Sequence, residues 1–169
     1  MNSQNIVVKI VLHKNINRKD LLLICDIKRA FGDYSLESQL DWINNNLADD
    51  DVHFMLFNNG VLVGYLNIIN TYFKCNGILY SAFGIGNVCT IEKCMGYGSL
   101  LLEKINCYIL KKNKYGLLFC KNNLIAFYSK YNWKLVNVDS KELITNCINT
   151  MVLSSNKTFE SIDYNERLF

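Results

Sequence analysis

The chain has 169 residues, of which 50% are hydrophobic and 20% are charged. This balance predicts one globular domain spanning residues 1–169 and excludes a largely disordered chain. The net charge of +3 is small, and the Lys and Arg residues are scattered along the sequence. Composition therefore gives no support to nucleic acid as a partner.

The cysteines predict reduced thiols in a cytoplasmic protein. Their number, 7, is odd and no CxxC spacing repeats, which argues against a disulfide framework and a zinc site, so we expect no bound metal. The apolar run within residues 1–13 is too short for a signal peptide or a membrane span, and we expect no membrane partner. The cysteines are Cys25, Cys75, Cys89, Cys94, Cys107, Cys120 and Cys147.

Hydrophobic periodicity and turn residues divide the chain into strands and helices. In chain order, we expect a strand at 6–12, helices at 21–31 and 36–47, strands at 53–57, 61–69 and 78–88, a helix at 98–111, a strand at 117–120, a helix at 123–131, and strands at 133–138 and 149–153. The polar tail at 154–169 receives no element. Antiparallel strands thus lead into a βαβ crossover, which predicts an α/β (α+β) fold with a mixed, mostly antiparallel central sheet flanked by helices.

Local signals mark the ends of these elements. Asp20 is expected to cap the first helix, Gly32 to break it, and Ser35 to cap the second helix. Asn-Gly pairs at 59–60 and 76–77 predict hairpin turns, because both residue types tolerate positive φ. Within the first helix, an apolar stripe at helical spacing includes one lysine: Leu21, Ile24, Ile27 and Lys28.

The stretch Lys93-Cys94-Met95-Gly96-Tyr97-Gly98 lies between a strand and a helix. A helix start presents unpaired N–H groups, and glycines let an anion approach them, so this loop is suited to a phosphate or pyrophosphate. The alternative is that the glycines only allow close packing of the helix on a strand. A P-loop is excluded because Gly98 is followed by Ser99-Leu100, and a dinucleotide loop because the third glycine is missing.

A second motif, Tyr128-Ser129-Lys130-Tyr131-Asn132-Trp133, ends a helix and enters a strand, with Asn132 where a left-handed cap is needed. Together the two motifs resemble those of the GNAT superfamily of acyl-CoA N-acetyltransferases. Their usual patterns are Arg/Gln-x-x-Gly-x-Gly/Ala and Tyr-Glu-Lys-x-Gly-Phe. Here Lys93, Asn132 and Trp133 replace the arginine, the glycine and the phenylalanine.

The resemblance implies a GNAT-like fold and transfer of an acetyl group from acetyl-CoA to a primary amine by direct attack. It implies a distorted fourth strand whose backbone near 86–90 bonds the pantetheine arm, with an N–H near Val88 for the oxyanion. It also implies that Tyr128 protonates the leaving thiolate. The implied cofactor-binding residues are Val88, Cys89, Lys93, Cys94, Met95, Gly96, Tyr97, Gly98, Ser99 and Asn123.

The general base stays unassigned, because the expected fourth strand has no carboxylate. Water linked to Asp33, or to the acidic tail, is one alternative. His53 is expected to be structural. Nucleophilic catalysis by Cys89 or Cys94 is a further alternative, which direct transfer does not require.

The acceptor site implied by the resemblance involves the two N-terminal helices and the loop between them, and we expect Asp33 and Tyr34 to bind substrate. Acidic residues in this region favour a small cationic acceptor. The run 30–34 with Asp41-Trp42 is loosely similar to the aminoglycoside 2′-N-acetyltransferase subgroup, although Gly84 stands where that subgroup has a glutamate. A peptide or protein amine as acceptor, and a catalytically inactive acyl-CoA-binding module, remain open, as do a monomer and a homodimer.

Overall fold

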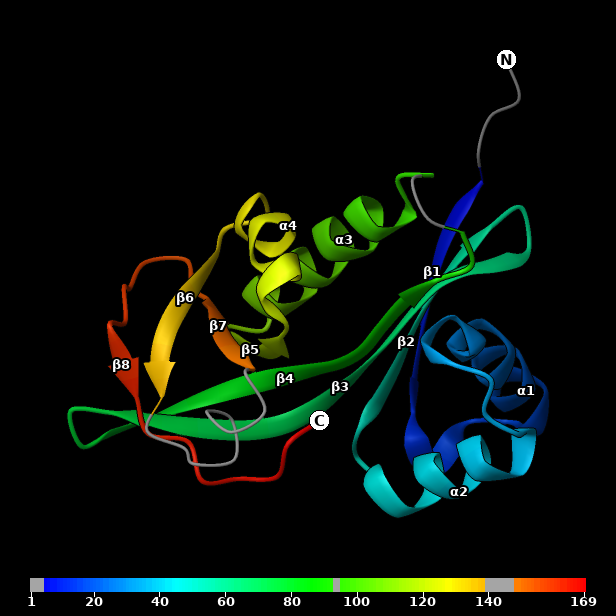
Figure 1. Ribbon diagram of the computed structural model, residues 1–169, viewed down its shortest axis with the longest axis horizontal. Coiled ribbons are helices and arrows are strands. Elements are labelled where there is room, and N and C mark those ends of the chain that lie inside the picture. The colour runs from blue at the N-terminus through cyan, green and yellow to red at the C-terminus, as the bar shows by residue number, and fades with distance from the viewer. Residues whose placement is uncertain (1–4, 93–94, 139–147) are drawn as a thin grey trace. The chain divides into compact units, whose positions relative to one another are not determined.

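The computed structural model describes residues 5–92, 95–138 and 148–169. Its strands pair in the order β1-β2-β3-β4-β5-β7-β6-β8 (Figure 1). The pairs β4–β5 and β6–β8 are parallel, whereas β1–β2, β2–β3, β5–β7 and β6–β7 are antiparallel, which confirms the predicted mixed sheet. The elements are β1 (Ile6–Leu12), α1 (Arg18–Ile27), α2 (Leu36–Asn46), β2 (Val52–Asn58), β3 (Val61–Cys75), β4 (Ile78–Thr90), α3 (Tyr97–Lys111), β5 (Tyr115–Cys120), α4 (Ile125–Ser129), β6 (Trp133–Val138), β7 (Asn149–Leu153) and β8 (Ser161–Ile162).

The chain divides into two compact units. The first unit contains residues Met1–Ile69 and Gly86–Leu101, and the second contains Asn70–Ile85 and Leu102–Phe169. The chain passes from one unit to the other within β3, β4 and α3. Each unit has its own apolar interior, and a single domain over the whole chain stays a prediction.

The first unit is built from β1, β2 and the start of β3, with α1 and α2 side by side (Figure 1). Asn59 and Gly60 have φ angles of 49° and 80°, which confirms the predicted Asn-Gly hairpin between β2 and β3. Ile24 and Ile43, from the two helices, are fully buried, as are Met55 and Tyr65 from the strands. Burial of these side chains is the main favourable term in holding the helices on the strands.

The prediction that Asp20 caps the first helix was wrong. The cap is Asn17, whose side-chain oxygen accepts a hydrogen bond of 2.9 Å from the Asp20 amide, and α1 begins at Arg18. Asp20 instead lies inside the helix, buried, and forms an ion pair of 2.6 Å with Lys9 of β1. The second cap is confirmed, because Ser35 Oγ accepts from the Ser38 amide at 3.1 Å.

The C-terminal tail, for which the sequence predicted no element, is an ordered part of the second unit. Residues 161 and 162 form β8 beside β6, and Asp163 exchanges two backbone hydrogen bonds with Lys74 of β3, at 2.8 and 3.0 Å. The buried cluster of this unit combines tail residues with the sheet: Phe73, Ala82, Leu117, Val136, Val152, Phe159, Ile162 and Tyr164. The tail is therefore part of the apolar interior.

The helix expected at 123–131 is shorter in the structure. A 3-10 turn at Asn122–Leu124 precedes α4, which covers only Ile125–Ser129. Asn132 has a φ of 66°, which confirms the left-handed cap predicted between this helix and β6. Trp133 then begins β6 and is fully buried, and its indole N–H donates to Asn106 Oδ1 at 3.0 Å.

Gly116 in β5 lies against Trp133. A Cβ atom at this position would stand 2.6 Å from the Trp133 ring and 3.0 Å from the Leu153 Cβ. We predict that Gly116→Ala lowers the free energy of unfolding by about 1–3 kcal/mol, because a fully buried ring has nowhere to move. Gly64→Ala is the matched control, since its Cβ would meet neighbours at an ordinary 3.5 Å. Urea unfolding that shows equal stabilities for the two variants would contradict this packing.

The first unit contains a row of three hydrogen-bonded side chains, His13, His53 and Tyr65. His53 of β2 is fully buried, with Nδ1 2.9 Å from the Tyr65 hydroxyl and Nε2 3.0 Å from His13 Nδ1. Burial, with smaller contributions from His13 and Lys28, lowers the pKa of His53 from 6.5 to about 4. The imidazole is therefore neutral at physiological pH, in agreement with the structural role expected for it.

This shift predicts a pH-dependent stability. The unfolded chain takes up the His53 proton near pH 6.5 and the folded chain only near pH 4, so the free energy of unfolding should fall as pH decreases through this interval, by up to about 3 kcal/mol. Urea unfolding at several pH values measures the fall. His53→Gln should remove most of it, and an unchanged slope in that variant would refute the assignment.

Candidate functional site

Strand β4 changes conformation at Asn87. Its pairing with β5 runs from Ala82↔Tyr115 to Ile85↔Leu118, whereas β4 itself continues to Thr90. Asn87 has a φ of 53°, in the left-handed region that asparagine tolerates better than most residues. A left-handed residue inside a strand distorts the ladder in the manner of a β-bulge. This distortion lies where the sequence resemblance implied one.

Two hydrogen bonds hold the distorted part of β4 on β3. Asn87 Nδ2 donates to Asn67 Oδ1 at 2.7 Å, and the Ile91 amide donates to the Val63 carbonyl at 3.1 Å. Val88 is half-buried and Cys89 is buried between these two points. The strand end is therefore fixed in place although its backbone geometry is irregular.

The start of α3 is accessible. Gly96 has a φ of 79°, and a Cβ atom there would meet nothing within 4 Å. The Leu100 amide donates to the Gly96 carbonyl at 3.1 Å, so the helix begins directly after this glycine. The N–H groups of the first turn have no intrahelical acceptors and form the positive end of the helix dipole. This geometry suits an anion.

The residues around that helix start differ in exposure, and one of them is anchored by a hydrogen bond. Met95 is exposed, and Tyr97, Gly98 and Ser99 are half-buried. The Tyr97 hydroxyl accepts a hydrogen bond of 3.2 Å from Asn58 Nδ2 of β2, which anchors the first turn within the first unit. Lys93 and Cys94, both predicted to bind the cofactor, lie outside the described residues.

The first unit also contains a pocket of about 290 Å³ that opens beside α2. Asn87 belongs both to this pocket and to the distorted part of β4, so the pocket adjoins that strand end. Tyr34, predicted to bind substrate, lines the pocket, whereas Asp33 is exposed and is not among the lining residues. The pocket is lined by Lys28, Tyr34, Ser38, Gln39, Trp42 and Asn87.

Lys28 is the charged residue of this pocket. It is only 7% exposed, and burial lowers its pKa from the usual value. Its Nζ lies 4.1 Å from the centre of the Trp42 ring, a cation–π contact. Two ion pairs among the described residues are Lys9–Asp20 and Arg29–Asp26, and neither involves Lys28.

The sequence-based prediction did not include most of these residues. Lys28 was noted within the apolar helical stripe but was not predicted to bind substrate, and Ser38, Gln39 and Asn87 were not singled out as site residues. A lysine in line with Leu21, Ile24 and Ile27 was a usable signal, because burial of an unpaired lysine is rare without a function.

The structure argues against a cysteine nucleophile at Cys89. Burial raises the pKa of its thiol to about 12, with only a partial opposing effect from Lys28. The thiolate is the reactive form of cysteine, so this group is unreactive near neutral pH. The other cysteine considered, Cys94, lies outside the described residues.

Tyr128 and Asn123 belong to the second unit. Tyr128 is buried, and burial raises the pKa of its hydroxyl well above the usual range. This hydroxyl therefore keeps its proton at neutral pH, as a proton donor must. Asn123 is exposed in the 3-10 turn before α4.

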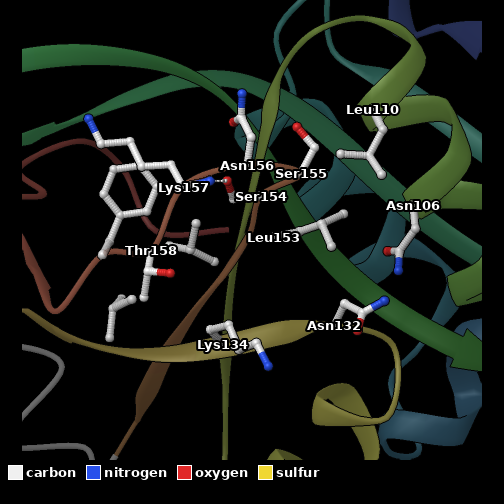
Figure 2. Close-up of a pocket in the computed structure, with 13 residues that line it drawn as sticks. Asn106, Leu110, Asn132, Lys134, Leu153, Ser154, Ser155, Asn156, Lys157 and Thr158 are labelled. Atoms are coloured by element: carbon white, nitrogen blue, oxygen red, sulfur yellow. Dashed lines mark hydrogen bonds between the residues drawn. The ribbon is translucent and has the colours of Figure 1, made fainter.

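A larger hollow, of about 540 Å³, lies in the second unit between α3, β6, β7 and residues 154–159 (Figure 2). Ser154 Oγ accepts a hydrogen bond of 3.0 Å from the Lys157 amide at its rim. None of the residues predicted to bind cofactor or substrate lines this hollow. The helix start at Gly96 and the pocket beside α2 therefore form the candidate site in the first unit, and Tyr128 and Asn123 are the predicted site residues of the second.

Two kinds of feature are absent from residues 5–92, 95–138 and 148–169: a membrane-spanning helix and a metal-binding cluster of side chains. No helix there is both long enough and apolar enough to cross a bilayer. No group of three or more His, Cys, Asp and Glu side chains in those same ranges is arranged to hold a metal ion.

Comparison with known proteins gives similarity in structure only. No protein-family model and no curated protein matches the sequence. An acyl-CoA N-acyltransferase from Pseudomonas aeruginosa has a TM-score of 0.62 and 18% identity, over 88% of this chain and 99% of that chain. The N-acetyltransferase YlbP from Bacillus subtilis, solved with coenzyme A, has a TM-score of 0.58 and 16% identity, over 94% of this chain and 99% of that chain.

The GNAT family N-acetyltransferase YhbS from Escherichia coli, also solved with CoA, has a TM-score of 0.62 and 11% identity, over 98% of this chain and 92% of that chain. Identities this low establish the architecture alone. The chain therefore has the fold of the GNAT acyl-CoA N-acyltransferases.

Proposed function

We propose that this chain, acting as one domain, transfers an acetyl group from acetyl-CoA to the primary amine of a small molecule by direct attack. The observation that carries the proposal is the open helix start at Gly96, which comes six residues after the end of the distorted strand β4 at Thr90. Proteins of the same fold have been solved with coenzyme A bound, which supports this choice of cofactor.

The residues present fit a diphosphate-bearing cofactor. Gly96 adopts a positive φ beside open space, so a phosphate could approach the first-turn amides of α3 without meeting a side chain. The backbone of Val88 and Cys89, beyond the last β4–β5 pair, would bond the pantetheine amides. When bound, the cofactor supplies an activated thioester.

The chain's own groups would then assist the transfer. The Val88 N–H would donate to the carbonyl oxygen as it gains negative charge. Tyr128 would give its proton to the departing thiolate. Strand β4 has no carboxylate to act as base, so we propose that water, linked to Asp33 or to the acidic tail, removes the proton from the acceptor ammonium.

One assay distinguishes the proposed function from three alternative functions. Acetyl-CoA is mixed with amino acids, polyamines, aminoglycosides and a peptide amine, and the release of free thiol is followed. Turnover of a small amine supports the proposal, and turnover of aminoglycosides alone would support the loosely similar subgroup. Turnover of the peptide alone would support a peptide acetyltransferase, and CoA binding without any turnover would support an inactive binding module.

We predict that Gly96→Glu weakens CoA binding by at least about tenfold, because it places a negative charge beside the diphosphate. The control is Gly96→Ala, which meets the same strain at a φ of 79° without the charge. Calorimetric titration with CoA compares the two variants. Equal affinities in Gly96→Glu and Gly96→Ala would remove the diphosphate from this helix start.

We predict that Tyr128→Phe lowers kcat by about 10²-fold or more with little change in CoA affinity, since the phenol is removed and the packing is kept. Tyr131→Phe, in the turn after α4, is the matched control and should behave as wild type. Steady-state kinetics with free-thiol detection gives both values. A Tyr128→Phe rate equal to that of the control would make Tyr128 a packing residue.

A further inference from the structure

We propose that the acceptor carries a carboxylate beside its amine, as an α-amino acid does, and that Lys28 and Gln39 recognise these two groups in the pocket. The inference rests on the proposed function and names its substrate class. It replaces a simple cation as the expected acceptor with a molecule that carries both charges.

The first argument is the uncompensated charge of Lys28. Its side chain is more than nine-tenths buried, and it has no carboxylate partner among the described residues. A buried ammonium group is costly unless it is paired, and the ring of Trp42 compensates it only in part. Lys28 lines an open pocket. A ligand carboxylate in this pocket would supply the missing negative charge.

The second argument is a hydrogen-bond acceptor atom that has no partner and belongs to a residue lining the same pocket. Gln39 is 5% exposed, and its Nε2 donates to the Tyr34 carbonyl at 3.3 Å. That carbonyl fixes the orientation of the amide, because it can only accept a hydrogen bond. The Gln39 Oε1 atom is buried without a partner. A buried oxygen without a hydrogen bond is suited to an N–H donor, and the amine of the substrate provides one.

The remaining walls limit the size and polarity of the ligand. The pocket measures about 290 Å³, at the small end of ligand sites, so it suits a single amino acid better than an extended peptide. Tyr34 and Trp42 supply aromatic surface for an apolar side chain. Asn87 connects the pocket to the Val88 amide proposed for the oxyanion, so a bound amine would lie next to the transferred group.

The carboxylates that favoured a cationic acceptor do not line this pocket. Asp33, Glu37 and Asp41 are all exposed, and water solvates them. A polycation in the pocket would instead meet the buried ammonium of Lys28. Repulsion between like charges at low exposure would oppose its binding.

The test compares each amino acid with an analogue that lacks the carboxylate. Free leucine, methionine and phenylalanine are assayed for acetyl transfer beside their carboxamides, which keep the amine and the side chain but lack the carboxylate. In wild type, at least one acid should exceed its amide in kcat/KM by about tenfold or more. Because amides have the more readily deprotonated amines, the decisive quantity is the change in this ratio between wild type and variant.

Lys28→Met should reduce that ratio by about tenfold while leaving CoA affinity unchanged. Methionine has a similar volume, and replacing a buried charge by an apolar group rarely destabilises a fold. Lys19→Met, an exposed position on α1, is the matched control for net charge and should keep the wild-type ratio. Lys28→Arg keeps the charge and should retain part of the preference.

A second readout is independent of turnover: calorimetric binding of the same amino acids to the CoA-loaded protein, wild type and Lys28→Met. Binding that depends on Lys28 in the absence of acetyl transfer would support the inference and refute the proposed function. An acid-to-amide ratio that Lys28→Met leaves unchanged, or wild-type turnover of polyamines at least as efficient as that of the acids, would overturn the inference and leave the proposed function intact. Failure of every amino acid both to bind and to react would also overturn the inference.

Discussion

The left-handed backbone at Asn87 is the constraint on which the candidate site depends. It interrupts the regular strand geometry directly after the last β4–β5 pair, at Ile85↔Leu118. The hydrogen bond from Asn87 to Asn67 keeps the irregular segment on β3, so the distortion is fixed. The same residue contributes to the pocket beside α2. In the proposed function, this one backbone conformation would leave peptide groups of β4 for the cofactor arm and would bring the Asn87 side chain to the acceptor pocket.

The electrostatics of the first unit separate structural groups from candidate functional ones. His53 and Tyr65 are fully buried but hydrogen-bonded to each other, and burial keeps both neutral. Lys28 and the Gln39 carbonyl oxygen are buried without equivalent partners, and both residues line the same pocket. Polar groups that are buried and satisfied contribute to a specific fold, whereas an unsatisfied group on a residue that lines a pocket is a candidate for ligand binding.

The sequence predicted the elements well where local chemistry decides them. The boundaries of β1, β6 and β7 match the expected strands, and the hairpin glycines and asparagines adopt positive φ. The helix start after Gly96 was predicted from two glycines. The sequence failed where tertiary contacts decide: Asp20 pairs with Lys9 across eleven residues of chain and so does not act as a cap. The tail is ordered by Lys74 and by the buried cluster of the second unit, which no local pattern indicates.

The candidate site shows the same division. The loop proposed to bind the diphosphate is a local motif that the sequence alone singles out, although Lys93 and Cys94 lie outside the described residues. The pocket combines positions 28, 39 and 87, which are distant in sequence, and its character depends on how deeply each side chain is buried. Composition pointed to acidic residues near the acceptor, but Asp33, Glu37 and Asp41 are exposed, whereas the buried charge that lines the pocket is the positive one of Lys28.

Amide hydrogen exchange in the presence and absence of CoA tests the central claim most directly. The claim is that backbone N–H groups at the start of α3 and at the distorted end of β4 bind the cofactor. Saturating CoA should slow exchange at the amides of residues 95–99 and 88–89 more than elsewhere in the chain. Unchanged exchange at both segments under saturating CoA, or protection confined to other segments, would contradict the account.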